Sequence, residues 1–339
     1  DNEILSYVAK IHEYKGKQEF YIRSKPVELE RLIEIAKVQS TEASNRIEGI
    51  ITTRSRLQQL MKDKTTPKNR DEEEILGYRN VLNLIHTNYE YIPFQSNYIL
   101  QLHRDLLKYT EHSYGGKYKT TPNEIDAVLP NGEKIMLFKP LDPYETPEAI
   151  ESICHSYQIA LEEEFVDPLI LIPCVILDFL CVHPFSDGNG RMSRLLTLLL
   201  LYKNDYVIGK YISIEKEIAD TKESYYQALS LSDDRWRIDE NDPKPFIKYM
   251  LGIILKCYRE FEKRLTISEK SGAKSTAYDI VKNFALDTIG TFTKRDVMES
   301  CPSLGSSSVE LALKKLVEDK TIKRIGKGRA SKYVRFDAY

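Results

Sequence analysis

The sequence predicts a mainly α-helical protein with one β-hairpin and a small C-terminal winged helix-turn-helix domain. The hairpin is expected where helical spacing stops, because a Pro-Asn-Gly turn at 130–132 lies between two short apolar runs. The last 65 residues differ again, with two short helices followed by two short strands. Elsewhere apolar residues recur at helical spacing, over 27–38, 71–88, 95–108 and 147–165.

The composition is that of an ordinary globular protein. Of 339 residues, 42% are hydrophobic and 29% are charged, and 49 basic and 51 acidic side chains leave a net charge of −2. The length exceeds one typical domain, and the composition excludes a disordered chain or a disulfide mini-protein. The charge is unevenly distributed, because residues 274–339 contain 13 basic and 8 acidic side chains.

Four regions are predicted along the chain. An N-terminal helical region spans 1–90 and the main helical core with its following helices spans 91–265. A polar stretch at 266–275 predicts a linker, and 276–339 would form the small C-terminal domain.

A membrane-spanning segment is not expected. The longest apolar run, 169–182, has fourteen residues and is interrupted by Pro173 and Asp178, whereas a span needs about twenty apolar residues. Five widely spaced cysteines predict reduced thiols of a cytoplasmic protein and neither disulfides nor a metal site. These features favour a cytoplasmic location without a membrane partner.

A polar loop at 183–190 lies between two strongly apolar segments. Gly188 and Gly190 flank Asn189 just before a helix, so backbone N–H groups can approach an anion closely. The N-terminus of that helix adds partial positive charge. The loop is therefore predicted to bind an anion.

Four charged or titratable side chains extend this prediction. Arg191 and Arg194 project from the first turn of the helix, and two guanidinium groups suit a di- or triphosphate. Asp187 among phosphate binders makes sense as a ligand of a divalent cation, and His183 is placed to take a proton from a hydroxyl. Taken singly, the histidine would be a capping or core residue and the arginines a solvated helix face.

Residues 183–194, HPFSDGNGRMSR, match the signature HPFxDGNGRxxR of the Fic (Fic/DOC) family at every specified position. The segment 102–106 followed by 115–118 resembles the family's helix and the start of its flap, and the hairpin at 121–138 lies where the family has that flap. The resemblance covers roughly 30–260. It implies a Fic-type helical domain and protein adenylyl transfer (AMPylation), in which AMP moves from ATP to a hydroxyl of a target protein.

The resemblance also implies a role for each matching residue. His183 would be the base, and Asp187 would hold Mg²⁺ between the α- and β-phosphates of ATP. Asn189 and the Gly188–Arg191 backbone, Gly190 included, would cradle the α-phosphate. The side chains of Arg191 and of Arg194 would bind the β- and γ-phosphates.

A second, shorter pattern lies near the N-terminus. Residues 44–49, SNRIEG, are similar to the (S/T)xxxE(G/N) motif of an inhibitory helix that many Fic proteins carry. On a helix, Ser44 and Glu48 share a face and Gly49 would end the helix. The resemblance implies that Glu48 pairs with Arg194 and inhibits the isolated protein. The alternative is that Glu48 is an exposed helix residue.

Two further surfaces are expected around the loop. The hairpin at 121–138 offers a strand edge along which a target protein would bind, although it could also be an ordinary surface hairpin. Tyr225 and Tyr226 resemble a pair that lies near the adenosine in the family. Because adjacent tyrosines cannot share one helix face, at least one of them is expected in the core.

The C-terminal domain leaves a second function open. Ser307 and Glu310 are predicted to form a capping box on its second helix. Residues 320–335 carry seven basic side chains and no acidic one, which suits DNA phosphates, although protein contacts or homo-oligomer formation would use the same domain. The alternative to an adenylyltransferase is therefore a DNA-binding transcriptional regulator whose Fic core is a nucleotide sensor or a vestige.

Overall fold

The structure, a computed structural model, describes most of the chain. The described residues are 1–24, 26–111, 114–123, 125–128, 134–270, 276–288, 290–301, 303–326, 328 and 331–336. Within them the fold is mainly α-helical, as predicted.

The chain forms two compact units that differ from the four predicted regions. One unit comprises Asp1–His12 and Ala36–Cys257, and the other comprises Glu13–Ile35 and Tyr258–Tyr339. The difference arises because three long helices each contribute residues to both units, namely α1 (Asn2–Ser24), α2 (Pro26–Ile47) and α11 (Lys244–Lys270).

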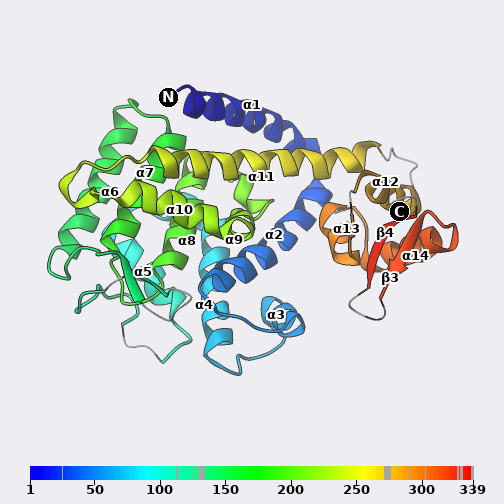
Figure 1. Ribbon diagram of the computed structural model, residues 1–339, viewed down its shortest axis with the longest axis horizontal. Coiled ribbons are helices and arrows are strands. Elements are labelled where there is room, and N and C mark those ends of the chain that lie inside the picture. Colours follow the sequence, from blue (N-terminus) through cyan, green and yellow to red (C-terminus); the bar gives the residue numbers. More distant parts are fainter. Residues whose placement is uncertain are drawn as a thin grey trace. The chain divides into compact units, whose positions relative to one another are not determined.

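Helix α8 (Asn189–Lys203) is the central helix of the first unit (Figure 1). Every residue from Arg191 to Tyr202 is buried, and α8 packs against α4 and α7. The predicted helices at 71–88, 95–108 and 147–165 are confirmed as α4 (Arg70–Asn88), α5 (Ser96–Leu106) and α6 (Thr146–Glu162), and the apolar run at 169–182 forms α7 (Pro168–Val182). The unit also contains α3 (Arg54–Met61), α9 (Ile214–Asp220) and α10 (Lys222–Asp233), with the short 3-10 turns η1 (Tyr89–Tyr91), η2 (Val207–Lys210) and η3 (Trp236–Ile238).

The polar loop lies between the end of α7 and the start of α8. At the other end of α7, the side chain of Asp167 accepts a hydrogen bond from Leu169 N, and Pro168 occupies the first turn, where its missing N–H costs nothing. His183, the residue after α7, has a φ of +50°, which ends the helical course of the chain. Helix α8 starts after Gly188, whose φ is +82°. Two left-handed residues therefore fix where the loop begins and ends.

The predicted hairpin is confirmed in its strands. Strand β1 (Ile125–Val128) pairs antiparallel with β2 (Lys134–Phe138). The predicted turn at 130–132 lies outside the described residues.

In the second unit, the C-terminal residues have their own apolar core. Helices α12 (Ala277–Asp287), α13 (Lys294–Ser300) and α14 (Ser306–Glu318) precede an antiparallel pair, β3 (Ile322–Ile325) and β4 (Lys332–Arg335). Val281, Phe292, Val309 and Leu316 are at most 2% exposed in this core. The order of three helices and a hairpin is consistent with a winged helix, and that assignment stays a prediction.

The predicted linker is partly helical. Helix α11 continues to Lys270, so the first five residues of the 266–275 stretch are helical despite their polar sequence. Residues 271–275 lie outside the described part of the chain.

The predicted capping box of Ser307 and Glu310 is wrong. Helix α14 starts two residues earlier than expected, with Gly305 as its N-cap and without a capping side chain. The carboxylate of Glu310 instead accepts a hydrogen bond from Lys294, and this ion pair removes the partner that the capping box would need.

All five cysteines are free, and only Cys174 is less than fully buried. Among the described residues, no helix is both long enough and apolar enough to cross a membrane.

Candidate functional site

His183 has the geometry of a neutral base. Its Nδ1 lies 3.2 Å from the carbonyl oxygen of Leu180, so Nδ1 must carry the proton that it donates there, and Nε2 keeps a free lone pair. Burial, assisted by the positive charge of Lys119, lowers the pKa of His183 to about 4. The imidazole is therefore neutral at physiological pH and able to accept a proton at Nε2.

Asn189 closes the loop that follows. Its Oδ1 accepts a hydrogen bond of 2.9 Å from Phe185 N, and its Nδ2 donates one of 2.7 Å to Phe185 O. The side chain thus holds the loop against the first turn of α8, where the initial N–H groups of a helix have no acceptor within the helix. The Asn189 side chain shapes the predicted anion site rather than projecting freely into it.

Glu48 pairs with Arg194, the contact that the resemblance implied. Arg194 Nη2 lies 2.7 Å from Glu48 Oε1, and the same guanidinium donates to Ser44 Oγ at 2.8 Å and to Ser44 O at 2.9 Å. Helix α2 ends at Ile47, so Glu48 belongs to the turn after the helix and not to the helix itself. Both predicted residues nevertheless contact one guanidinium.

The Glu48 carboxylate also lies against the N-terminus of α8. A Cβ atom at position 190 would lie 2.3 Å from Glu48 Oε1, so the approach depends on Gly190 having no side chain. A carboxylate of the chain thus occupies the place where the sequence predicts that phosphate oxygens bind.

Arg191 is placed differently from the prediction. Its side chain is 1% exposed, and its Nη1 lies 2.6 Å from Oε2 of Glu74, which is 2% exposed. Its Nη2 lies 3.4 Å from Asp187 Oδ1. The guanidinium therefore ties α8 to α4, and phosphate binding by this side chain stays a prediction.

Removing the charge of Glu74 will destabilise the protein. In Glu74→Gln, Arg191 keeps its burial but loses its closest counter-charge, so we expect the free energy of unfolding to fall by about 3 kcal/mol in chemical denaturation. The neighbouring Glu73, which is only partly buried, provides the control Glu73→Gln, with a change below about 0.5 kcal/mol. Equal losses in the two variants would contradict this role.

Asp187 is a partly exposed carboxylate. It accepts a hydrogen bond from Gly188 N at 2.6 Å, and Arg70 and Arg191 each lie 3.4 Å from one of its oxygens. Among the described residues, no cluster of three or more His, Cys, Asp or Glu side chains could hold a metal. A single carboxylate does fit Mg²⁺, which proteins often bind through one or two carboxylates together with substrate phosphates.

The two predicted adenosine residues have different surroundings. Tyr225 is 3% exposed and packs against Phe246 and Tyr249, so it is the core member of the pair. Tyr226 is 43% exposed. Contact with adenosine stays a prediction, and Tyr226 is the residue whose ring is accessible for it.

The role of His103, on α5, was not predicted from the sequence. Its Nδ1 accepts a hydrogen bond from Gly116 N, its Nε2 donates to Asp187 O, and both distances are 3.0 Å. The ring stacks on Phe185 with centroids 3.6 Å apart, and burial lowers the pKa of His103 to about 4. His103 therefore holds the loop in place through its hydrogen bond to Asp187 O and its stacking on Phe185. The sequence carried no signal for this role, because His103 acts through backbone groups.

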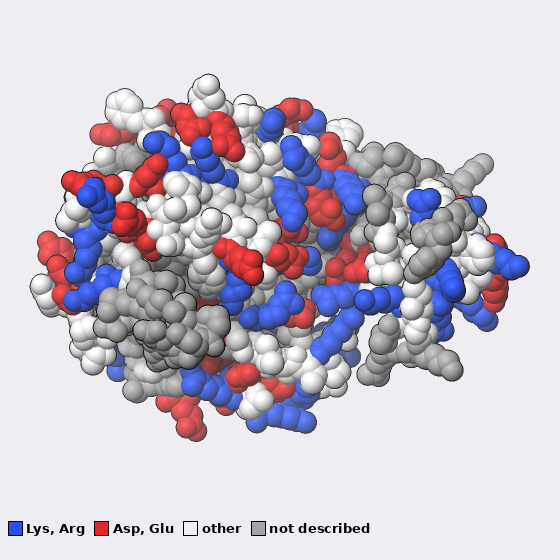
Figure 2. Space-filling view, viewed as in Figure 1, with Lys and Arg blue, Asp and Glu red and all other residues white. Residues whose placement is uncertain are grey.

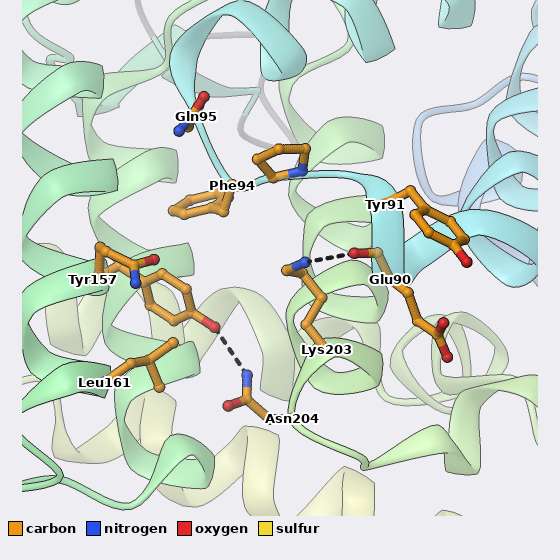
Figure 3. A pocket seen from close by; sticks show the side chains of 10 residues that line it. Glu90, Tyr91, Phe94, Gln95, Tyr157, Leu161, Lys203 and Asn204 are labelled. Atoms are coloured by element: carbon orange, nitrogen blue, oxygen red, sulfur yellow. Dashed lines mark hydrogen bonds between the residues drawn. The ribbon is translucent and has the colours of Figure 1, made fainter.

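A second hollow lies at the opposite end of α8. It has a volume of about 250 Å³, and Figure 3 shows Glu90, Tyr157, Lys203 and Asn204 among its lining residues. The ends of a helix of this length are about 22 Å apart. Lys203 Nζ already donates to Glu90 O, and Asn204 donates to the Tyr157 hydroxyl. This hollow is separate from the loop.

The family model described as "Fic/DOC family" matches residues 93–201, which include the entire loop between α7 and α8. Residues 93–201 thus carry a Fic/DOC-type domain. A Fic family protein from Desulfovibrio desulfuricans G20 shares the fold over 99% of this chain and 96% of its own, with a TM-score of 0.64 and 20% identity. Fic-1 (residues 134–508) from Caenorhabditis elegans has a TM-score of 0.62 at 17% identity, over 78% of this chain and 74% of its own.

Curated Fic relatives named protein adenylyltransferase Fic are similar in sequence. The one from Nematostella vectensis is 23% identical over 262 residues, which are 74% of this chain and 53% of that protein. The one from Aedes aegypti is 28% identical over 152 residues, which are 45% of this chain and 26% of that protein. The chain thus spans about half the length of the first Fic relative and about a quarter of the second.

Proposed function

We propose that the chain is a protein adenylyltransferase, which transfers AMP from ATP to a hydroxyl side chain of a target protein. The observation that carries this proposal is the position of His183 at the start of the loop that leads into the N-terminus of α8, with its Nδ1 bonded to Leu180 O and its Nε2 able to accept a proton. The names of the curated relatives support the same activity.

In the proposed reaction, Nε2 of His183 takes the proton of the target hydroxyl. The hydroxyl oxygen forms a bond to the α-phosphorus of ATP, the bond from that phosphorus to the bridging oxygen breaks, and pyrophosphate leaves. The N–H groups at the start of α8 and the Arg194 guanidinium stabilise the phosphate charges. Asp187 would hold Mg²⁺, which would neutralise charge on the phosphates.

Glu48 inhibits this reaction in the proposal. Its carboxylate lies at the N-terminus of α8 and forms an ion pair with Arg194. It therefore competes with ATP phosphate for both the helix N-terminus and the guanidinium. Release of Glu48 then makes the site available to the γ-phosphate.

The activity will depend on pH through His183. Since a base acts only when unprotonated and burial lowers the pKa of His183, we expect kcat/KM of Glu48→Gly to stay constant from pH 8 to about pH 5 and to fall below that. Glu48 itself raises the pKa of His183, so its removal moves the fall to still lower pH. A fall centred near 6.5, the ordinary imidazole value, would contradict a buried base.

The hairpin of β1 and β2 is the proposed docking place of the target, because its strands offer backbone groups for strand addition.

The proposed adenylyl transfer is tested by incubating the native chain, Glu48→Gly and His183→Ala with a cell lysate, Mg²⁺ and ATP labelled on the α-phosphate. Labelled protein should be strongest with Glu48→Gly and absent with His183→Ala. The absence of label with every variant would reject adenylyl transfer.

Nucleic-acid binding is the second candidate function. On β3 and β4, the side chains of Lys323, Arg324 and Lys332 are exposed. Helix α14 is less suited to read bases, because it exposes Glu310 and Leu311. On the face that Figure 2 shows, acidic and basic side chains are interspersed over the larger unit. A salt-dependent duplex-binding signal that persists in His183→Ala would favour the regulator.

A further inference from the structure

Two residues of the segment before the hairpin, Lys119 and Asn123, donate hydrogen bonds to the main-chain carbonyl groups of residues 182–185, where α7 ends and the loop begins. Lys119 Nζ donates to Val182 O at 3.0 Å, and Lys119 N donates to Pro184 O at 2.9 Å. Asn123 Nδ2 lies 3.3 Å from His183 O and 3.0 Å from Phe185 O and donates to both. Two residues thus satisfy four successive carbonyl groups.

The two side chains also hold one another. Lys119 Nζ donates to Asn123 Oδ1 at 2.8 Å, which fixes the Asn123 amide with its Nδ2 toward the loop. Lys119 is only 3% exposed, an unusual position for a lysine that needs specific hydrogen bonds to be tolerated. Its ammonium also lies at the C-terminal end of α7, where a helix favours positive charge.

These contacts act on a strained part of the chain. His183 has a φ of +50°, which is unfavourable for a residue with a Cβ and requires support from its surroundings. Asn123 binds the carbonyl of His183 itself, and Lys119 binds the carbonyls on either side of it. Strand β1 begins at Ile125, two residues after Asn123.

We propose that Lys119 and Asn123 are positioning residues that hold His183 in its reactive orientation and link the base of the target-binding hairpin to the catalytic loop. This inference rests on the proposed adenylyl transfer and deepens it. A target strand on β1 would be connected through Asn123 to the backbone of the residue that takes its proton.

The charge of Lys119 adds an electrostatic consequence. Burial lowers the pKa of Lys119 to about 8, so it is mostly charged at neutral pH, and this charge lowers the pKa of His183. Glu48 faces the same imidazole and has the opposite effect. Loss of the Lys119 charge therefore raises the pKa of His183.

The test compares Lys119→Met, Asn123→Asp and the control Lys117→Met, each in the Glu48→Gly background. Asn123→Asp keeps an acceptor for Lys119 but loses the donor to the loop, and Lys117 is an exposed lysine two residues before Lys119. We expect the first two variants to lower kcat about 10- to 100-fold with KM for ATP changed less than about twofold. If both match the Lys117→Met rate, the inference is wrong. If Lys119→Met fails to fold, the kcat of Asn123→Asp relative to that of Lys117→Met tests the inference alone.

A second measurement does not depend on AMP transfer. NMR titration of the His183 imidazole, identified by its loss in His183→Ala, should give a higher titration point in Lys119→Met than in Lys117→Met. If Glu48→Gly transfers no AMP but this shift is present, the proposed function fails and the positioning contact stands. An unchanged titration point in Lys119→Met, together with a rate of Asn123→Asp equal to that of Lys117→Met, would overturn the inference.

Discussion

Replacing Glu48 with glycine will raise AMP transfer, including modification of the chain itself, by about 10- to 100-fold. The ion pair with Arg194 and the close approach to Gly190 place the carboxylate where phosphate should bind, so its removal makes both groups available to ATP. A difference of this size corresponds to a typical coupling free energy between two competing ligands. Initial rates with α-labelled ATP and calorimetric ATP affinities of both chains provide the measurement.

Glu48→Gln is the matched variant for this prediction. The amide has the size of the carboxylate and can still accept a hydrogen bond from Arg194, but it carries no charge. We expect an activity between those of the native chain and Glu48→Gly. Equal rates for the native chain and Glu48→Gly would show that the pair does not inhibit.

Replacing His183 with alanine will abolish the activity of Glu48→Gly, with a loss of about 100- to 10,000-fold, the usual contribution of a general base. ATP affinity should change little, because the proposed phosphate contacts come from α8 and not from the imidazole. Transfer rates and calorimetric ATP affinities measured on the same preparations separate the two effects.

The left-handed backbone of His183 calls for a second variant. Asparagine tolerates a positive φ better than alanine, so His183→Asn tests loss of the base with less strain on the loop. The exposed His155 supplies the control His155→Ala, which should keep full activity. Residual transfer above about a tenth of the parent rate in both His183 variants would exclude this histidine as the base.

The helices and the central loop were predictable from the sequence for physical reasons. Apolar spacing marks buried helix faces, and the apolar α7 and α8 could only be interior helices around a polar connection. The pairing of Glu48 with Arg194 was implied by resemblance alone, since 146 residues separate the two. Periodicity within one helix does not encode such a distant contact.

The supporting contacts of the loop were not predictable. His103, Lys119 and Asn123 act through hydrogen bonds to backbone carbonyls and N–H groups, which every sequence contains and which leave no pattern of residue types. The burial of Arg191 was missed for a related reason. Its partner Glu74 lies on a helix with several acidic residues, and only the packing of α4 against α8 selects that one.

A comparison of two labels shows whether the α-phosphate of ATP becomes bonded to protein. Glu48→Gly is incubated with Mg²⁺, a cell lysate and ATP labelled on either the α- or the γ-phosphate, with Glu48→Gly/His183→Ala beside it. We expect protein-bound label from α-labelled ATP only, and only with His183 present. Protein-bound label from γ-labelled ATP, or no label from either nucleotide, would contradict this expectation.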